Sequence, residues 1–149
     1  MGTNYRAKIS KKNKYWISKH RFYEIEHHCL QYKEWEDEYK TLKKQGVKGV
    51  EYDGMPHGTN VGNPTEAIGM RMAELSAKMD LVKNTVEESD RVVIEKHGKE
   101  KSIYKHLLVA VTNEGISYNY LNMIMDIPVS EKVYYEARRR FYWLMSQKI

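Results

Sequence analysis

The sequence has few of the residues that interrupt helices or cross-link chains. Its 149 residues include 3 prolines, 1 cysteine and 9 glycines, and most of the glycines cluster between Gly46 and Gly62. Because proline and glycine are the strongest helix breakers, their scarcity elsewhere predicts that most of the chain forms long helices. The single cysteine, Cys29, cannot form an internal disulfide, which fits a reducing cytoplasm.

Long apolar runs are also missing. No apolar segment follows the early lysines, so we expect no signal peptide. No stretch approaches the roughly 18–20 apolar residues of a membrane span, so we expect no membrane partner. A chain of this length with 41% hydrophobic residues can build a modest core, but not a large enzyme body with a deep pocket. The sequence therefore predicts a small cytoplasmic protein.

Acidic residues are absent from the first 21 positions, where basic residues are frequent. Residues 138–140 form a second basic cluster of three arginines, whereas the middle of the chain is mixed or acidic. The formal net charge is +5. Positive charge concentrated at both ends favours a polyanionic partner. The basic residues of the first segment are Arg6, Lys8, Lys11, Lys12, Lys14, Lys19 and Arg21.

The spacing of the apolar residues predicts an all-α fold. Residues 1–17 indicate a basic, flexible arm in which aromatic side chains are interleaved with lysines. An apolar stripe then predicts a helix from about Ser18 to Gln45, which Gly46 is well placed to end. The stripe consists of Phe22, Ile25, Cys29, Tyr32, Trp35, Tyr39 and Leu42.

A second long helix has a well-defined predicted start. Asn63 can cap it, Pro64 suits the first helical position, and Glu66 completes a capping box. Two striped helices should pack as an antiparallel hairpin, over residues 18–97, that serves for interaction or dimerisation. Alternatively, one stripe forms a coiled coil with a second chain. The second stripe consists of Ile68, Met72, Leu75, Met79, Val82 and Val86.

The remaining segments complete the predicted layout. The glycine-rich residues 46–63 indicate a long connector, whose role stays open. Broken periodicity and Gly98 predict a domain boundary there, so that residues 98–149 form a C-terminal domain. Within it the sequence predicts three shorter helices, over residues 102–113, 117–125 and 130–147.

Residues 116–149 have the pattern of a helix-turn-helix. A short apolar helix ends at Met125, and Pro128 prevents it from continuing. Val129 can point into the core, and Ser130 can cap the next helix. A short helix, a turn of a few residues and a longer basic helix are typical of DNA-binding proteins that read the major groove.

The last predicted helix has two different faces. One carries Tyr134, Ala137, Phe141 and either Leu144 or Met145 at helical spacing, which predicts that it packs inward. The other face would enter the major groove with its N-terminal half, while Arg138 and Arg140 flank it and hold phosphates. The predicted DNA-binding residues are Ser130, Lys132, Val133, Tyr135, Glu136, Arg138, Arg139 and Arg140. The alternative is an ordinary amphipathic helix with a solvated basic face.

We expect neither an enzyme nor a metal or cofactor site. His27, His28 and Cys29 are adjacent, so they point to different sides of a helix and cannot reach one ion. His57 and Asp53 lie in the glycine-rich segment without a phosphate-binding signature. No local spacing builds a Ser-His-Asp or Cys-His arrangement, so we predict no catalytic residues.

Residues Ile127 to Gln147 resemble the last helices of phage late-gene transcriptional activators of the RinA and ArpU type. The C-terminal part of that family is in turn similar to sigma-factor region four, a helix-turn-helix that recognises the upstream promoter element. The matching positions are Val129, Ser130, Glu131, Lys132 and the arginines 138–140. The resemblance extends upstream to residues 27–42, reading HHCLQYKEWEDEYKTL, and 63–89, reading NPTEAIGMRMAELSAKMDLVKNTVEES.

This resemblance implies a sigma-like activator of late phage genes, acting in the cytoplasm of a bacterial host cell. Its C-terminal helices would bind double-stranded promoter DNA, and its N-terminal hairpin would form a homodimer or contact RNA polymerase. Two other functions stay open from the sequence. One is a small terminase subunit for phage DNA packaging, and the other is a helical adaptor protein without a DNA role.

Overall fold

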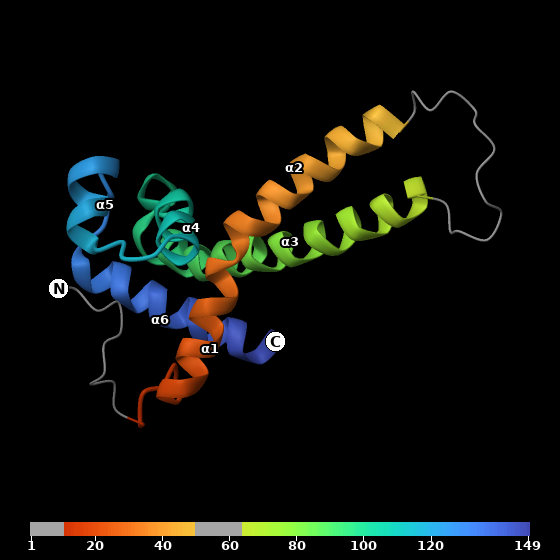
Figure 1. Cartoon of the computed structure of the whole chain (residues 1–149). Helices are drawn as coiled ribbons and strands as arrows, with labels where there is room; N and C mark the ends of the chain where they lie inside the picture. The colour runs from red at the N-terminus through yellow and green to blue at the C-terminus, as the bar shows by residue number, and fades with distance from the viewer. Residues whose placement is uncertain (1–10, 50–63) are drawn as a thin grey trace, which may run out of the picture. The chain divides into compact units, whose positions relative to one another are not determined.

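A computed structural model describes residues 11–49, with only the backbone for 47–49, and residues 64–149 (Figure 1). All regular structure in these two ranges is helical, as the sequence predicts. None of the helices there is both long and apolar enough to cross a membrane. The elements are α1 (Lys19–Leu30), α2 (Tyr32–Gly49), α3 (Pro64–His97), a 3₁₀ turn (Lys99–Lys101), α4 (Tyr104–Thr112), α5 (Tyr118–Met125) and α6 (Glu131–Lys148).

The helices divide into two compact units that differ from the expected domains. One unit combines residues up to Gln31 with Val82–Ile149, and the other comprises Tyr32–Leu81. The expected division at Gly98 is therefore wrong, because α3 runs without a break from Pro64 to His97 and its second half belongs with the C-terminal helices. The predicted cap Asn63, and most of the predicted connector 46–63, lie outside the described residues.

The single helix predicted from Ser18 to Gln45 is in fact two helices. Ser18 caps α1 by accepting a hydrogen bond from the Arg21 amide, and α1 ends at Leu30. The Gln31 amide then donates to the His28 carbonyl at 3.2 Å, which tightens the last turn before α2 begins. The helix is divided between α1 and α2 because residues of its apolar stripe pack in two different cores. Its first residues are buried with the C-terminal helices, and the rest belong to the other unit.

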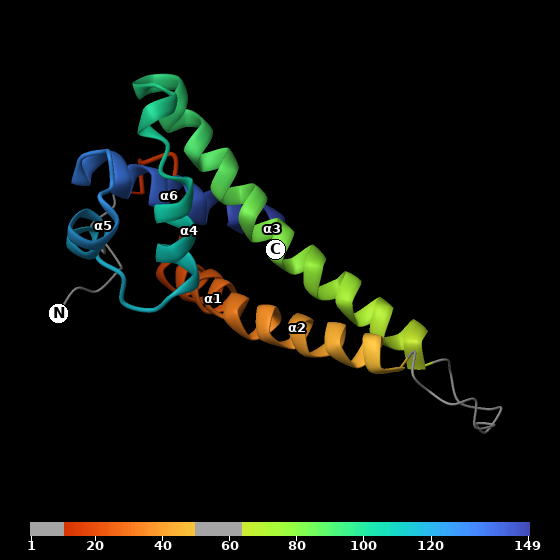
Figure 2. The same ribbon diagram turned by 90° about the horizontal axis from the view of Figure 1, so that it is seen from above.

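In the larger unit, α1 packs against α4 and α6 (Figures 1 and 2). Arg21 links α1 to the end of α6, because its guanidinium donates a hydrogen bond to the Ser146 carbonyl at 3.0 Å. The rings of Phe22 and Tyr142 meet edge to face with centroids 4.8 Å apart. The core of this unit is therefore built by segments from opposite ends of the chain.

The second half of α3 joins the same core through buried polar groups as well as valines. Ser89 donates from its hydroxyl to the Ala137 carbonyl at 2.6 Å. Asp90 accepts from the Ile103 amide at 2.7 Å and from the Ser102 hydroxyl at 2.7 Å. These bonds satisfy backbone groups where α4 begins and fix the connection that follows α3.

Within the smaller unit, α2 and the first half of α3 run antiparallel, side by side in both views (Figures 1 and 2). Glu38 accepts two hydrogen bonds from Arg71, at 2.7 and 3.0 Å, while the Lys78 ammonium lies 5.7 Å from the Trp35 ring centroid. Later residues of α3 thus meet earlier residues of α2. Trp35 and Leu75 are the buried apolar side chains between these contacts.

Candidate nucleic-acid interface

The turn between α5 and α6 is held from both sides. Asp126 ends α5 in the left-handed conformation (φ 52°), and the Ile127 amide donates back to the Leu121 carbonyl at 3.1 Å. Ser130 then caps α6, because its hydroxyl accepts from the Val133 amide at 3.4 Å. Ile127 and Val129 are buried, as predicted for Val129. A backbone hydrogen bond, a helix cap and two buried apolar side chains therefore stabilise this turn.

Two further side chains join this turn to its neighbours. The Tyr118 hydroxyl donates to the Val129 carbonyl at 2.5 Å. The Nε2 atom of His106, on α4, lies 2.9 Å from the Met125 carbonyl, so this nitrogen carries the donated proton. His106 is buried, and it links α4 to the end of α5. The three C-terminal helices are thereby connected through hydrogen bonds to one turn.

The inward face of α6 is the one the sequence predicts. Tyr134, Ala137, Phe141 and Met145 are buried, whereas Leu144 is half-buried. Burial raises the pKa of the Tyr134 hydroxyl to about 12, and the nearby Arg138 only partly offsets this effect. Tyr134 also meets Tyr118 of α5 with ring centroids 5.9 Å apart. This face fixes the orientation of α6 around its axis.

Arg138 does not lie on the exposed face of α6. It is only 4% exposed, and its guanidinium lies over the rings of Phe22 and Tyr142, at 5.5 and 4.9 Å from their centroids. Its Nη2 atom is also 4.0 Å from a carboxylate oxygen of Glu26. The prediction that Arg138 holds a phosphate is therefore wrong in this arrangement. Helix α1 covers it, and nothing local to residues 130–147 indicates this.

Arg140 is also buried, at 5% exposure. Its Nη2 atom donates to the Ser89 carbonyl at 2.7 Å, and its guanidinium carbon lies 5.9 Å from the Tyr15 ring centroid. Arg140 is thus not an exposed phosphate contact on the outer face. It does line a hollow on a neighbouring face of α6.

Four of the residues that the sequence predicts to bind DNA lie on the outer face of α6. Lys132 and Ser130 are exposed, and Tyr135 and Arg139 are half-buried. Tyr135 packs edge to face on Tyr134, with ring centroids 4.9 Å apart, which restricts its position. Lys132, Tyr135 and Arg139 are three or four residues apart, so they form one stripe along the helix.

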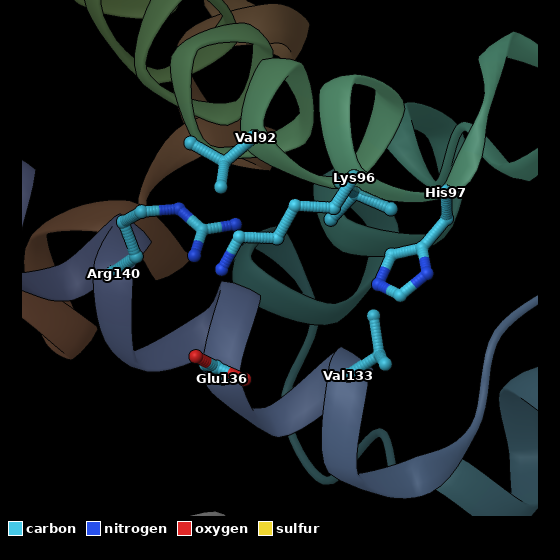
Figure 3. A pocket seen from close by; sticks show the side chains of 7 residues that line it. Val92, Lys96, His97, Val133, Glu136 and Arg140 are labelled. Atoms are coloured by element: carbon cyan, nitrogen blue, oxygen red, sulfur yellow. The ribbon is translucent and has the colours of Figure 1, made fainter.

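The other two predicted residues, Val133 and Glu136, face a different direction. Together with Arg140 they line a small hollow between α6 and the end of α3 (Figure 3). Lys96 and His97 of α3 contribute its polar wall on the opposite side. The sequence gives no signal for this pairing, because α3 reaches α6 only through tertiary packing.

The basic segment before α1 also lies against α6. Tyr15 meets Trp143 edge to face with centroids 5.7 Å apart, and Lys14 lies 4.9 Å from the Tyr15 ring. The Trp16 amide bonds the Asn13 carbonyl at 3.0 Å, which shapes a turn. Residues 11–17 therefore have a defined place, unlike the flexible arm that the sequence predicts, and residues 1–10 lie outside the described part. The lysines of residues 11–17 are exposed, namely Lys11, Lys12 and Lys14.

Metal ligation has no support in the described ranges, where no three His, Cys, Asp or Glu side chains are grouped to hold an ion. Cys29 is fully buried, and burial, together with the charge of Glu26, raises its thiol pKa to about 12. Such a thiol is protonated at neutral pH and acts as a small core side chain.

The structure thus combines a hydrogen-bonded turn between α5 and α6, a stripe of Lys132, Tyr135 and Arg139 on α6, and exposed lysines in the segment before α1. No protein-family model, curated protein or solved structure matches this chain.

Proposed function

We propose that this protein is a sequence-specific, DNA-binding transcriptional regulator of phage origin that activates late genes. The observation that carries the proposal is the α5–α6 pair, with its turn anchored by Ile127 and Val129 and its second helix capped by Ser130. A short helix, a fixed turn and a longer basic helix are the parts of a helix-turn-helix, whose second helix enters the major groove.

In this proposal the stripe Lys132, Tyr135 and Arg139 faces the base edges. Arginine and lysine recognise guanine through its two major-groove acceptors, and tyrosine bonds phosphates or packs on methyl groups. The amides at the start of α6 add a favourable place for a phosphate. Arg138 has no part in it, because its guanidinium is buried among aromatic rings and beside Glu26.

The smaller unit has a different role in the proposal. The antiparallel pair of α2 and the first half of α3 acts as a helical hairpin that forms a homodimer or contacts RNA polymerase. A dimer would present two reading helices to two half-sites, which increases both affinity and specificity. The resemblance to RinA and ArpU activators supports this division of labour, and it places the protein in the cytoplasm of a bacterial host.

A mobility-shift assay across a salt series tests the proposal. Fragments from around the protein's own gene are compared with a random duplex, since non-specific binding is lost first as salt rises. We expect one fragment to stay bound when the random duplex has dissociated. Lys132→Ala and Arg139→Ala should weaken that complex about 10-fold or more, whereas Lys40→Ala, an exposed lysine of α2, serves as the charge-matched control. If all three variants bind the fragment with equal affinity, α6 is not the helix that contacts the bases.

A small terminase subunit is the second candidate, because it too would combine a DNA-reading helix with a helical pair for assembly. The mass of the protein in solution separates the two. A ring of about eight or more subunits supports packaging, and a monomer or dimer supports regulation. If the protein binds no duplex even at low salt, both DNA-binding functions are excluded. The remaining possibility is then a helical adaptor protein without a DNA role.

A further inference from the structure

The starting point is a buried positive charge without a negative partner. Arg140 is 5% exposed, and among the described residues no carboxylate lies within 4.0 Å of its guanidinium nitrogens. Its Nη2 atom donates to the Ser89 carbonyl, but its Nε atom is buried without a hydrogen-bond partner in the described part of the chain. Burying an uncompensated charge is costly, so Arg140 favours an anion beside it.

The position of Lys96 strengthens this argument. Its side chain extends from α3 toward the Arg140 guanidinium, so two cations converge on the same hollow (Figure 3). Like charges repel, and an exposed lysine could equally extend into solvent. Convergence of an ammonium on a guanidinium is the arrangement that one oxyanion between them stabilises.

The rest of the hollow suits a small anion. Val92, Val93 and Val133 form apolar walls that exclude part of the water and strengthen charge interactions. His97 adds a ring beside Val133 (Figure 3). Glu136 lines the same hollow, so with both cations counted the site carries an excess of one positive charge.

We propose that this hollow between α3 and α6 binds one phosphate group, with Lys96 and Arg140 as its donors. The phosphate belongs to the DNA backbone. This identification of its source rests on the proposed function. The phosphate would lie beside the groove that α6 enters, and the end of α3 would fix the register of the protein on DNA. Glu136 then weakens the phosphate contact rather than reading a base.

The first test uses inorganic phosphate and needs no DNA. Methyl signals of Val92 and Val133 are followed by NMR while phosphate replaces chloride at constant ionic strength. We expect a saturable shift of both, roughly 10-fold weaker binding in Lys96→Gln, and tighter binding in Glu136→Gln. Lys40→Gln is the control, and Arg140 is left intact because its loss would disturb the core. Absence of a saturable shift, or an equal shift in Lys96→Gln, overturns the proposal.

The second test identifies the source of the phosphate. Each neutralised DNA phosphate contributes about 0.9 to the slope of log Kobs against log salt, so Lys96→Gln should reduce the slope by about that amount and Lys40→Gln should not. If phosphate binds and DNA binds, but the slope is unchanged in Lys96→Gln, the DNA source is wrong and a free phosphate is the ligand. If phosphate binds and no duplex binds, the phosphate site stands and the proposed function fails.

Discussion

At the scale of single residues, the three consecutive arginines have three different environments. Arg138 lies over the rings of Phe22 and Tyr142, Arg140 lines the hollow, and Arg139 lies on the outer face of α6. Their order in the sequence gives no sign of this. A helix turns by about 100° per residue, so neighbours point in different directions, and the environment of each is set by α1 and α3, which are distant in sequence.

The burial of Arg138 gives the first prediction. Arg138→Ala removes the stacking on Phe22 and Tyr142 and leaves Glu26 half-buried without its nearest cation, so it should lower the free energy of unfolding by about 2–3 kcal/mol. Urea denaturation measures this change. Lys132→Ala is the control and should stay within about 0.5 kcal/mol of the parent. If Arg138→Ala instead lowers DNA affinity and leaves stability unchanged, Arg138 contacts DNA and has no structural role.

Tyr134 leads to a prediction about alkaline pH. Its hydroxyl is buried, has no hydrogen-bond partner within the described residues, and has its pKa raised by burial to about 12. The unfolded chain, with an ordinary tyrosine pKa near 10, releases this proton first, so stability is lost as pH rises from about 10 to 12. Tyr134→Phe should be at least as stable as the parent at pH 7 and lose less stability above pH 10. Thermal unfolding at pH 7 and pH 11 compares the two.

Cys29 gives a chemical readout of the same core. Because burial raises its pKa to about 12, the native thiol should react with an alkylating reagent at pH 8 roughly 100-fold or more slowly than the denatured protein. The rate is measured with a thiol-specific dye with and without denaturant. Equal rates would show that α1 leaves the core readily.

At the scale of elements, the C-terminal helices follow from local signals. Ser130 caps α6 as predicted, Ser117 caps α5 at the start of a predicted helix, and Pro64 is the first residue of α3. Caps and proline act within a few residues, so a single sequence reveals them. The break at Gln31 is not visible in this way, because it depends on which core each turn of helix joins.

The end of α3 provides a prediction at this scale. Gly98 has φ 103°, a backbone conformation that side chains with a Cβ rarely adopt, so Gly98→Ala should destabilise the protein by about 1–2 kcal/mol. Gly69, which lies inside α3, is the matched control. A Cβ at Gly69 meets nothing within 4 Å, so Gly69→Ala should raise stability by about 0.5–1 kcal/mol. Two changes of the same sign, measured by urea denaturation, would contradict this account.

At the scale of the whole molecule, the sequence predicts the class of fold but not its assembly. The all-helical content follows from periodicity, whereas the two units cut across the predicted boundary at Gly98. The larger unit joins segments from both ends of the chain, as the contact of Tyr15 with Trp143 illustrates. Pairings between residues so far apart are fixed by packing, for which a single sequence carries no periodic signal.

That pairing of chain ends makes a final prediction about charge. Tyr15 holds the lysines of residues 11–14 beside α6, so the segment should add phosphate contacts to the DNA interface rather than act alone. Changing Lys11, Lys12 and Lys14 together to Gln should lower the slope of log Kobs against log salt by roughly 2–3, equally for specific and random DNA, because phosphate contacts carry no sequence information. The same change at the exposed residues Lys40, Lys43 and Lys44 of α2 removes equal charge and should leave the slope within about 0.5 of the parent value. If both triple variants lower the slope alike, net charge rather than the placed segment governs binding, and the contact of Tyr15 with Trp143 has only a structural role.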